Sequence, residues 1–188
     1  FGVLASEKVF VSRDYHFNKV KTFHHMMDER TQEEPQAWDL EGATHRAGFK
    51  IEELVEFVRA ASSSEEDFEQ AVGQLHQALD QAAEKVVKKT PAKQDLVGQA
   101  DALIDTLYFT YGSFVLMGVD QERIFDIVHH ANMGKMFPDG KAHFDPVTHK
   151  ILKPDDWEEK YAPEPAIKKE IERQIKAYER HKEREDKK

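Results

Sequence analysis

Apolar side chains recur every three or four residues along most of the chain, which is the spacing of one face of an α-helix. The first such stretch covers residues 14–30, with apolar positions at Phe17, Val20, Phe23 and Met27. Further helices are predicted at about 44–61, from Ser64 to about Lys89, at about 95–117 and at about 120–133. Because no stretch alternates apolar and polar residues over any length, the pattern predicts an all-α helical bundle.

The helical period is interrupted once near the C-terminal end. Residues 134–157 carry Gly, Pro and Asp at turn spacing, which predicts an irregular loop segment. The remaining chain is nearly all charged, yet an apolar stripe runs from Ile167 to Tyr178 and predicts a charged C-terminal helix. We therefore expect a helical domain over residues 14–160 and a charged, partly helical tail over 161–188.

Composition narrows the function classes. The 188 residues carry a formal charge of −9, which argues against binding to nucleic-acid phosphates, because that requires clustered Lys and Arg. The absence of cysteine excludes disulfides, thiolate zinc sites and cysteine nucleophiles. No apolar run approaches the roughly 20 residues that cross a bilayer, and the opening residues do not resemble a signal peptide. We expect a cytoplasmic protein without a membrane or nucleic-acid partner.

Candidate chemistry begins in the stretch FKIEELVEF, residues 49–57. On a helix, Glu52, Glu53 and Glu56 gather on one side, opposite the apolar residues. Such a cluster is most often a solvated face. Like charges at this spacing repel each other, however, so a bound cation is the alternative interpretation.

The helix predicted at about 95–117 strengthens the cation interpretation. It is apolar almost all round, which is typical of a buried helix, yet it carries Asp101 and Asp105 four residues apart on one face. Two ionised carboxylates in apolar surroundings are costly unless Lys, Arg, backbone amides or a cation compensate them. If the glutamate side of the earlier helix packs here, five carboxylates converge, and these oxygen ligands suit Mg²⁺ or Mn²⁺.

Other residues with known chemistry have less specific patterns. The histidines His24 and His25, like His129 and His130, are adjacent in the chain, so each pair points in two directions and suits structural roles better than a zinc site. A tryptophan in a loop can stack on a nucleobase, but more often it anchors the loop to the core.

The stretches EELVE, DALIDTLYFTYG and VHHANMGKMFPDGK resemble the all-α nucleoside triphosphate pyrophosphohydrolases. This MazG-like superfamily includes dimeric dUTPases and phosphoribosyl-ATP pyrophosphohydrolases, and the resemblance covers roughly residues 17–157. The family pattern is EExxE on one helix and ExxD on the next. The first half is complete here. In the second half Asp105 fits the final Asp, but Ala102 replaces the Glu, and Asp101 could substitute for it.

The resemblance implies the reaction and the ligands. It implies Mg²⁺-dependent hydrolysis between the α and β phosphates, with Glu52, Glu53 and Glu56 as catalytic residues. The same three glutamates, with Asp101 and Asp105, are the implied metal ligands. Implied substrate-binding residues are Asn132, Lys135, Lys141 and Lys153. Family members form homodimers or homotetramers, so we expect the same here, with dUTP or a broader range of dNTPs as substrate.

Two alternatives remain open from the sequence. The same scaffold could hydrolyse phosphoribosyl-ATP, because no base-reading pocket is evident. The chain could instead be a non-catalytic helical dimerisation module, since Ala102 replaces a family glutamate. Against the module, a catalytically inactive scaffold would have no use for two carboxylates in an apolar helix.

Overall fold

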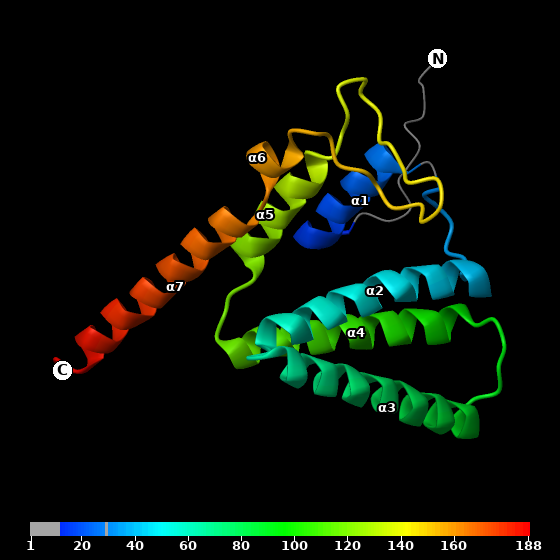
Figure 1. Cartoon of the computed structure of the whole chain (residues 1–188), viewed down its shortest axis with the longest axis horizontal. Helices are drawn as coiled ribbons and strands as arrows, with labels where there is room; N and C mark the ends of the chain where they lie inside the picture. Colours follow the sequence, from blue (N-terminus) through cyan, green and yellow to red (C-terminus); the bar gives the residue numbers. More distant parts are fainter. Residues whose placement is uncertain (1–11, 29) are drawn as a thin grey trace, which may run out of the picture. The chain divides into compact units, whose positions relative to one another are not determined.

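The structure is a computed structural model that describes residues 12–28 and 30–188 (Figure 1). Its helices are α1 (Tyr15–Met27), α2 (Leu40–Ala61), α3 (Glu65–Lys89), α4 (Leu96–Met117), α5 (Glu122–Met133), α6 (Trp157–Tyr161) and α7 (Glu164–Glu185). The described residues form no β-strand, and a single antiparallel bridge joins Phe144 to Ile151 in the irregular segment. The prediction of an all-α fold is therefore confirmed.

Local capping explains where some of the helices begin or end. The Ser64 side chain accepts a hydrogen bond from the Asp67 N–H and starts α3 at the predicted place. The Asp39 side chain accepts from the Gly42 N–H, so α2 begins at Leu40, earlier than expected. After α4, Gly118 adopts a φ of 70°, which glycine reaches without a Cβ clash.

The chain divides into two compact units. The first extends to Glu33 and resumes at Tyr108, and the second is Glu34–Leu107. The boundary between α4 residues Leu107 and Tyr108 lies inside one continuous helix. The charged tail is part of the first unit, because α7 packs on α5. The proposed separation of domain and tail near residue 160 stays a prediction.

In the first unit, α5 lies between α1 and α7 (Figure 1). The His16 ring on α1 stacks on the Phe125 ring on α5, with centroids 4.1 Å apart. Lys19 pairs with Asp126 at 2.9 Å between Nζ and Oδ1. These contacts fix α1 against α5.

A polar network holds α7 in place. Glu170, 8% exposed, accepts hydrogen bonds from Arg173 and Gln174. Gln174 also bonds in both directions to the main chain of Asp120, accepting from its N–H at 2.9 Å and donating to its carbonyl at 2.8 Å. The tail helix continues to Glu185, beyond the end of its apolar stripe at Tyr178.

The short helix α6 closes the C-terminal end of α5. Trp157 is 5% exposed and donates its indole N–H to the Ala131 carbonyl at 2.8 Å. The Tyr161 ring lies so close to Gly134 that a Cβ there would be 2.7 Å from Cδ2 of the ring. Glycine is therefore the residue that admits this close approach.

The second unit contains α2, α3 and the first part of α4. The α2 and α3 helices pack on each other, and Arg59 pairs with Glu65 across their connection at 2.7 Å. Gln99 of α4 bonds in both directions to the main chain of Trp38, before α2. None of the described residues of α2, α3 or α4 is fully buried.

Among the described residues, no helix combines the length and apolar character needed to cross a membrane.

Candidate functional site

The glutamates of α2 stand on its exposed surface. Glu52, Glu53 and Glu56 are all exposed, while Val55 and Val58 on the other side are half-buried. Within the described part of the chain, no hydrogen bond or ion pair engages the carboxylates of Glu53 and Glu56. These groups therefore have free oxygen lone pairs available for a ligand.

The aspartates of α4 are exposed as well, which corrects one expectation. The apolar composition predicts a buried helix, but in the part of α4 that belongs to the second unit Val97 and Ile104 are 78% and 61% exposed, respectively. The physical reason is that α2 and α3 of this unit pack on each other rather than burying α4. Asp101 and Asp105 are exposed, and within the described residues no hydrogen bond or ion pair engages their carboxylates.

All five predicted metal ligands lie in the second unit. Among the residues that the structure describes, no group of three or more His, Asp or Glu side chains is placed to hold a metal ion. The donor chemistry fits Mg²⁺, because the carboxylates supply the oxygen ligands that it prefers. The convergence of the five carboxylates stays a prediction.

The predicted substrate-binding residues all belong to the first unit. Asn132 is the penultimate residue of α5, and its carbonyl accepts the Lys135 N–H at 3.1 Å. The Nζ of Lys153 lies 4.1 Å from the centroid of the Trp157 ring, and that of Lys135 lies 5.9 Å away. The structure therefore brings two of the predicted lysines to one aromatic ring, a contact that the sequence pattern does not reveal.

Lys141 lies on a separate, well-defined turn. Its N–H donates to the Asp139 side chain at 3.0 Å, and its carbonyl accepts the Phe137 N–H at 3.0 Å. The Phe137 and His143 rings stack with centroids 3.9 Å apart. The hydrogen bond from His143, followed by that from the Lys141 N–H, lowers the pKa of Asp139. These contacts fix the backbone that carries Lys141.

Of the two histidine pairs, His129 and His130 have contacts that support a structural role. His130 contacts the Tyr161 ring with centroids 5.5 Å apart, and burial, with the nearby Lys19 charge, lowers the pKa of His129. Neither pair belongs to a group that could hold a metal, within the residues described. Trp157 anchors α6 to α5, in agreement with the loop-anchor interpretation.

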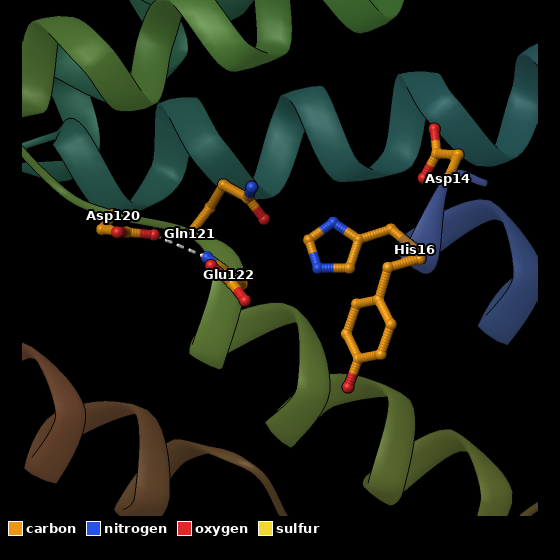
Figure 2. Close-up of a pocket in the computed structure, with 6 residues that line it drawn as sticks. Asp14, His16, Asp120, Gln121 and Glu122 are labelled. Atoms are coloured by element: carbon orange, nitrogen blue, oxygen red, sulfur yellow. Dashed lines mark hydrogen bonds between the residues drawn. The ribbon is translucent and has the colours of Figure 1, made fainter.

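A shallow depression of about 290 Å³ lies between the starts of α1 and α5. Figure 2 shows the His16 ring directed toward Gln121 across this depression. Two of its three carboxylates already have partners, since Asp14 accepts the Phe17 N–H and Asp120 accepts the Glu122 N–H. None of the predicted site residues lines it, so we do not assign it to the candidate site.

Comparisons with known proteins identify the family. The model of the phosphoribosyl-ATP pyrophosphohydrolase family matches residues 20–132, which include the glutamates and aspartates discussed above. The chain is also similar to a crystal structure from Exiguobacterium sp. 255-15, named a "putative NTP pyrophosphohydrolase", at 38% identity and a TM-score of 0.78. The similarity covers 89% of this chain and 99% of that one.

No curated protein shows significant similarity to the chain. The family match nevertheless extends over more than half of it, and the solved structure is similar along almost its entire length. The predicted resemblance to the all-α nucleotide pyrophosphohydrolases is thus confirmed, and the chain belongs to the phosphoribosyl-ATP pyrophosphohydrolase family.

Proposed function

We propose that the protein is a Mg²⁺-dependent nucleoside triphosphate pyrophosphohydrolase that acts on dUTP or a broader set of dNTPs. Water attacks the α-phosphorus, and the bond from that phosphorus to the oxygen bridging to the β-phosphate breaks. The bridging oxygen leaves with pyrophosphate, so the nucleoside monophosphate carries the oxygen that came from water. Family membership and the similarity to the Exiguobacterium protein support this reaction type.

The carboxylates of the second unit have the central role in this proposal. Glu52, Glu53 and Glu56, with Asp101 and Asp105, would hold Mg²⁺, with Mn²⁺ as a substitute. The bound ions would supply neutralisation of the polyphosphate charge. One of the α2 glutamates accepts the proton of the attacking water or orients it, since phosphoryl transfer needs positioning more than a special nucleophile.

The residues of the first unit are proposed to bind substrate. Lys135, Lys141 and Lys153 would pair with phosphate oxygens as point charges, and Asn132 would donate its amide to the sugar or base. These roles concern binding, so their loss should raise KM more than it lowers kcat.

The proposal includes a second copy of the chain, as a homodimer or a homotetramer. Apart from Asp101 and Asp105, α4 carries no charged residue, and its apolar side chains are exposed over most of its length. Exposed apolar surface of this extent typically marks a protein contact. An identical chain supplies a matching apolar face, because a two-fold axis places the same surface on both sides of an interface.

The observation that carries the proposal is the state of the acidic groups in the second unit. Four carboxylates, those of Glu53, Glu56, Asp101 and Asp105, have no protein partner within the described residues, although two of them interrupt an otherwise apolar helix. A cation bound by several carboxylates offsets the cost of placing them together.

The test measures pyrophosphate release from each common NTP and dNTP with Mg²⁺. The wild type is compared with Glu53→Gln and Asp105→Asn, and with Glu84→Gln, which changes an exposed glutamate on α3, as the matched control. We expect the two site variants to lose activity by at least about a hundredfold and the control to keep it. In heavy-oxygen water, the label should enter the monophosphate. Release that survives both site substitutions would refute the assignment.

Phosphoribosyl-ATP is the second candidate substrate, because the matching family model is named for its hydrolysis. If the folded protein releases no pyrophosphate from any nucleoside triphosphate, phosphoribosyl-ATP is tested next with the same variants. Failure with both substrates would favour a non-catalytic helical dimerisation module.

A further inference from the structure

Two lysines from distant parts of the irregular segment share one aromatic ring. Lys135 follows the end of α5, and Lys153 precedes α6. Their ammonium nitrogens lie 5.9 and 4.1 Å, respectively, from the centroid of the Trp157 ring, within the range of a cation–π interaction. Both ammonium groups therefore interact with the same aromatic ring.

The ring itself is held rigidly. Trp157 is 5% exposed, its indole N–H donates to the Ala131 carbonyl at 2.8 Å, and its main-chain N–H donates to the Pro154 carbonyl at 2.9 Å. On the same short helix, Tyr161 packs against Gly134. The indole is thus fixed to the end of α5, immediately before the stretch that leads to Lys135.

The arrangement has a physical consequence for anions. A lysine ammonium normally moves on a flexible four-carbon stem, and fixing it costs rotamer entropy. A ring that restrains two ammonium groups lowers this cost before a ligand arrives. The two positive charges repel each other, so an anion with several charges that contacts both is favoured over a monovalent one. The Oε1 of Glu158 lies 3.7 Å from the Nζ of Lys153, so such an anion would displace this carboxylate.

We propose that Trp157 is a positioning residue that holds Lys135 and Lys153 together as a polyphosphate-binding pair. The proposal rests on the proposed function only in naming the substrate phosphates as the natural ligand. Binding of an inorganic polyphosphate without metal is a separate property and can be measured without catalysis.

The first experiment uses Trp157 as its own reporter. The chain has two tryptophans, so the Trp38→Phe variant leaves Trp157 as the only indole. Titration with inorganic triphosphate, without metal and at constant ionic strength, should change the Trp157 emission in a saturable way, while acetate, a monovalent anion, should bind at least about tenfold more weakly. In this background Lys135→Met and Lys153→Met should each weaken triphosphate binding by about tenfold or more.

Lys168→Met serves as the matched control, because Lys168 is an exposed lysine on α7 away from the tryptophan. Its triphosphate affinity should equal that of the parent within about twofold. Unchanged affinity in both the Lys135 and the Lys153 variants would overturn the proposal.

The second experiment separates positioning from folding. Trp157→Phe and Trp157→Leu both lose the hydrogen bond to Ala131, but only the phenylalanine keeps an aromatic ring. Calorimetric titration should show triphosphate affinity close to wild type in Trp157→Phe and about tenfold lower in Trp157→Leu. Equal affinities in two folded variants would show that the ring has no positioning role. If Trp157→Leu does not fold, the lysine variants decide the outcome.

Catalytic assays then distinguish this inference from the proposed function. With active enzyme, Lys153→Met should raise KM for the nucleotide by about tenfold and leave kcat nearly unchanged. If no nucleotide is hydrolysed but triphosphate binding depends on both lysines and the ring, the proposed reaction fails and the phosphate site stands. If hydrolysis occurs and triphosphate binding ignores the lysines and the ring, only the inference on Trp157 fails.

Discussion

The two compact units differ in how well one chain completes them. In the first, α5 is packed by α1 and α7, and Met27, Ala131, Trp157 and Glu170 are buried. In the second, α2, α3 and the first part of α4 contain no fully buried residue, although α2 and α3 carry apolar stripes and α4 is apolar almost all round. Helical periodicity alone therefore does not make a core, because an apolar stripe contributes to stability only when it is covered.

The two units also have different proposed roles in binding. The carboxylates proposed to hold cations belong to the less complete unit, and the lysines proposed to bind phosphate belong to the better packed one. The first unit should therefore fold largely on its own contacts, whereas the second should depend on the second copy that we propose. The following predictions test this contrast.

Breaking the proposed contact at α4 should have the largest effect. Ile104→Glu places a charge on a residue that is 61% exposed in the single chain and apolar in character. If a second copy covers α4, the change costs about 2 kcal/mol of apolar burial per copy, together with the desolvation of the charge. Light scattering should then report monomers, and circular dichroism should report a loss of helix.

Val147→Glu is the matched control for that experiment. Val147 is 83% exposed in the irregular segment, outside the helices. The mass of the Val147→Glu protein in solution should equal that of the wild-type protein. A wild-type protein that is monomeric at all concentrations, or an Ile104→Glu protein that remains a dimer, would contradict the predicted interface.

Adding metal should stabilise the second unit next most strongly. At a hundred times its dissociation constant, Mg²⁺ adds about 2.7 kcal/mol to the free energy of unfolding, because it binds only the native state. Thermal melting with millimolar Mg²⁺ should show this increase in wild type and in Glu84→Gln, but not in Asp105→Asn. A melting temperature that ignores both Mg²⁺ and Mn²⁺ would count against the five-carboxylate site.

Adding one methyl group should have opposite effects in the two units. Gly134→Ala forces a Cβ against the Tyr161 ring and should lower the free energy of unfolding by about 1–3 kcal/mol. Gly73→Ala, in α3, meets nothing within 4 Å and should raise it by about 0.5–1 kcal/mol through helix propensity. Urea titration of both variants checks this, and a destabilising Gly73→Ala would reveal a tightly covered face at that position.

Acid should weaken the first unit modestly through Glu170. Hydrogen bonds from Arg173 and Gln174 lower the pKa of Glu170 from 4.5 to about 2. A carboxyl group whose pKa is lower in the folded state stabilises it fully above the unfolded pKa, and this contribution disappears as the pH falls toward the folded one. Stability should therefore decrease from about pH 5 to pH 2.

Glu170→Gln isolates that contribution. Arg30 also lowers the pKa of Asp28 to about 2. Asp28 therefore contributes to the pH dependence of stability over the same pH range in the wild type and in Glu170→Gln. Urea midpoints of the variant should consequently depend less on pH than those of the wild type in this window. Identical slopes would mean that the Glu170 network does not stabilise the fold.

Local signals explain which parts of the fold could be predicted. The helix boundaries at Ser64 and Gly118 could be predicted, because a helix cap and a glycine with positive φ act within a few residues. The early start of α2 at Leu40 was missed, because the Asp39 cap lies among other polar residues. The short α6 was missed as well, since the Ala131 carbonyl that holds Trp157 is 26 positions away.

The candidate site also combines features that local spacing predicts with features that depend on long-range contacts. Spacing alone predicted that Glu52, Glu53 and Glu56 share one side of a helix. It also predicted that Asp101 and Asp105 share a face of a second helix, and the structure has these residues in α2 and α4, respectively. Whether the five carboxylates meet is a long-range property. The apolar composition of α4 predicts burial, but whether other helices cover it depends on long-range contacts, so its exposure could not be predicted.

In each unit, a glutamine attaches a helix to the chain just before another helix. Gln99 binds the main-chain N–H and carbonyl of Trp38, and Gln174 binds those of Asp120, as a neighbouring strand would. Because these bonds do not involve the partner's side chain, evolution can vary positions 38 and 120 without breaking them. Positions 99 and 174 have no such latitude: glutamate lacks the donor, and asparagine is one carbon too short.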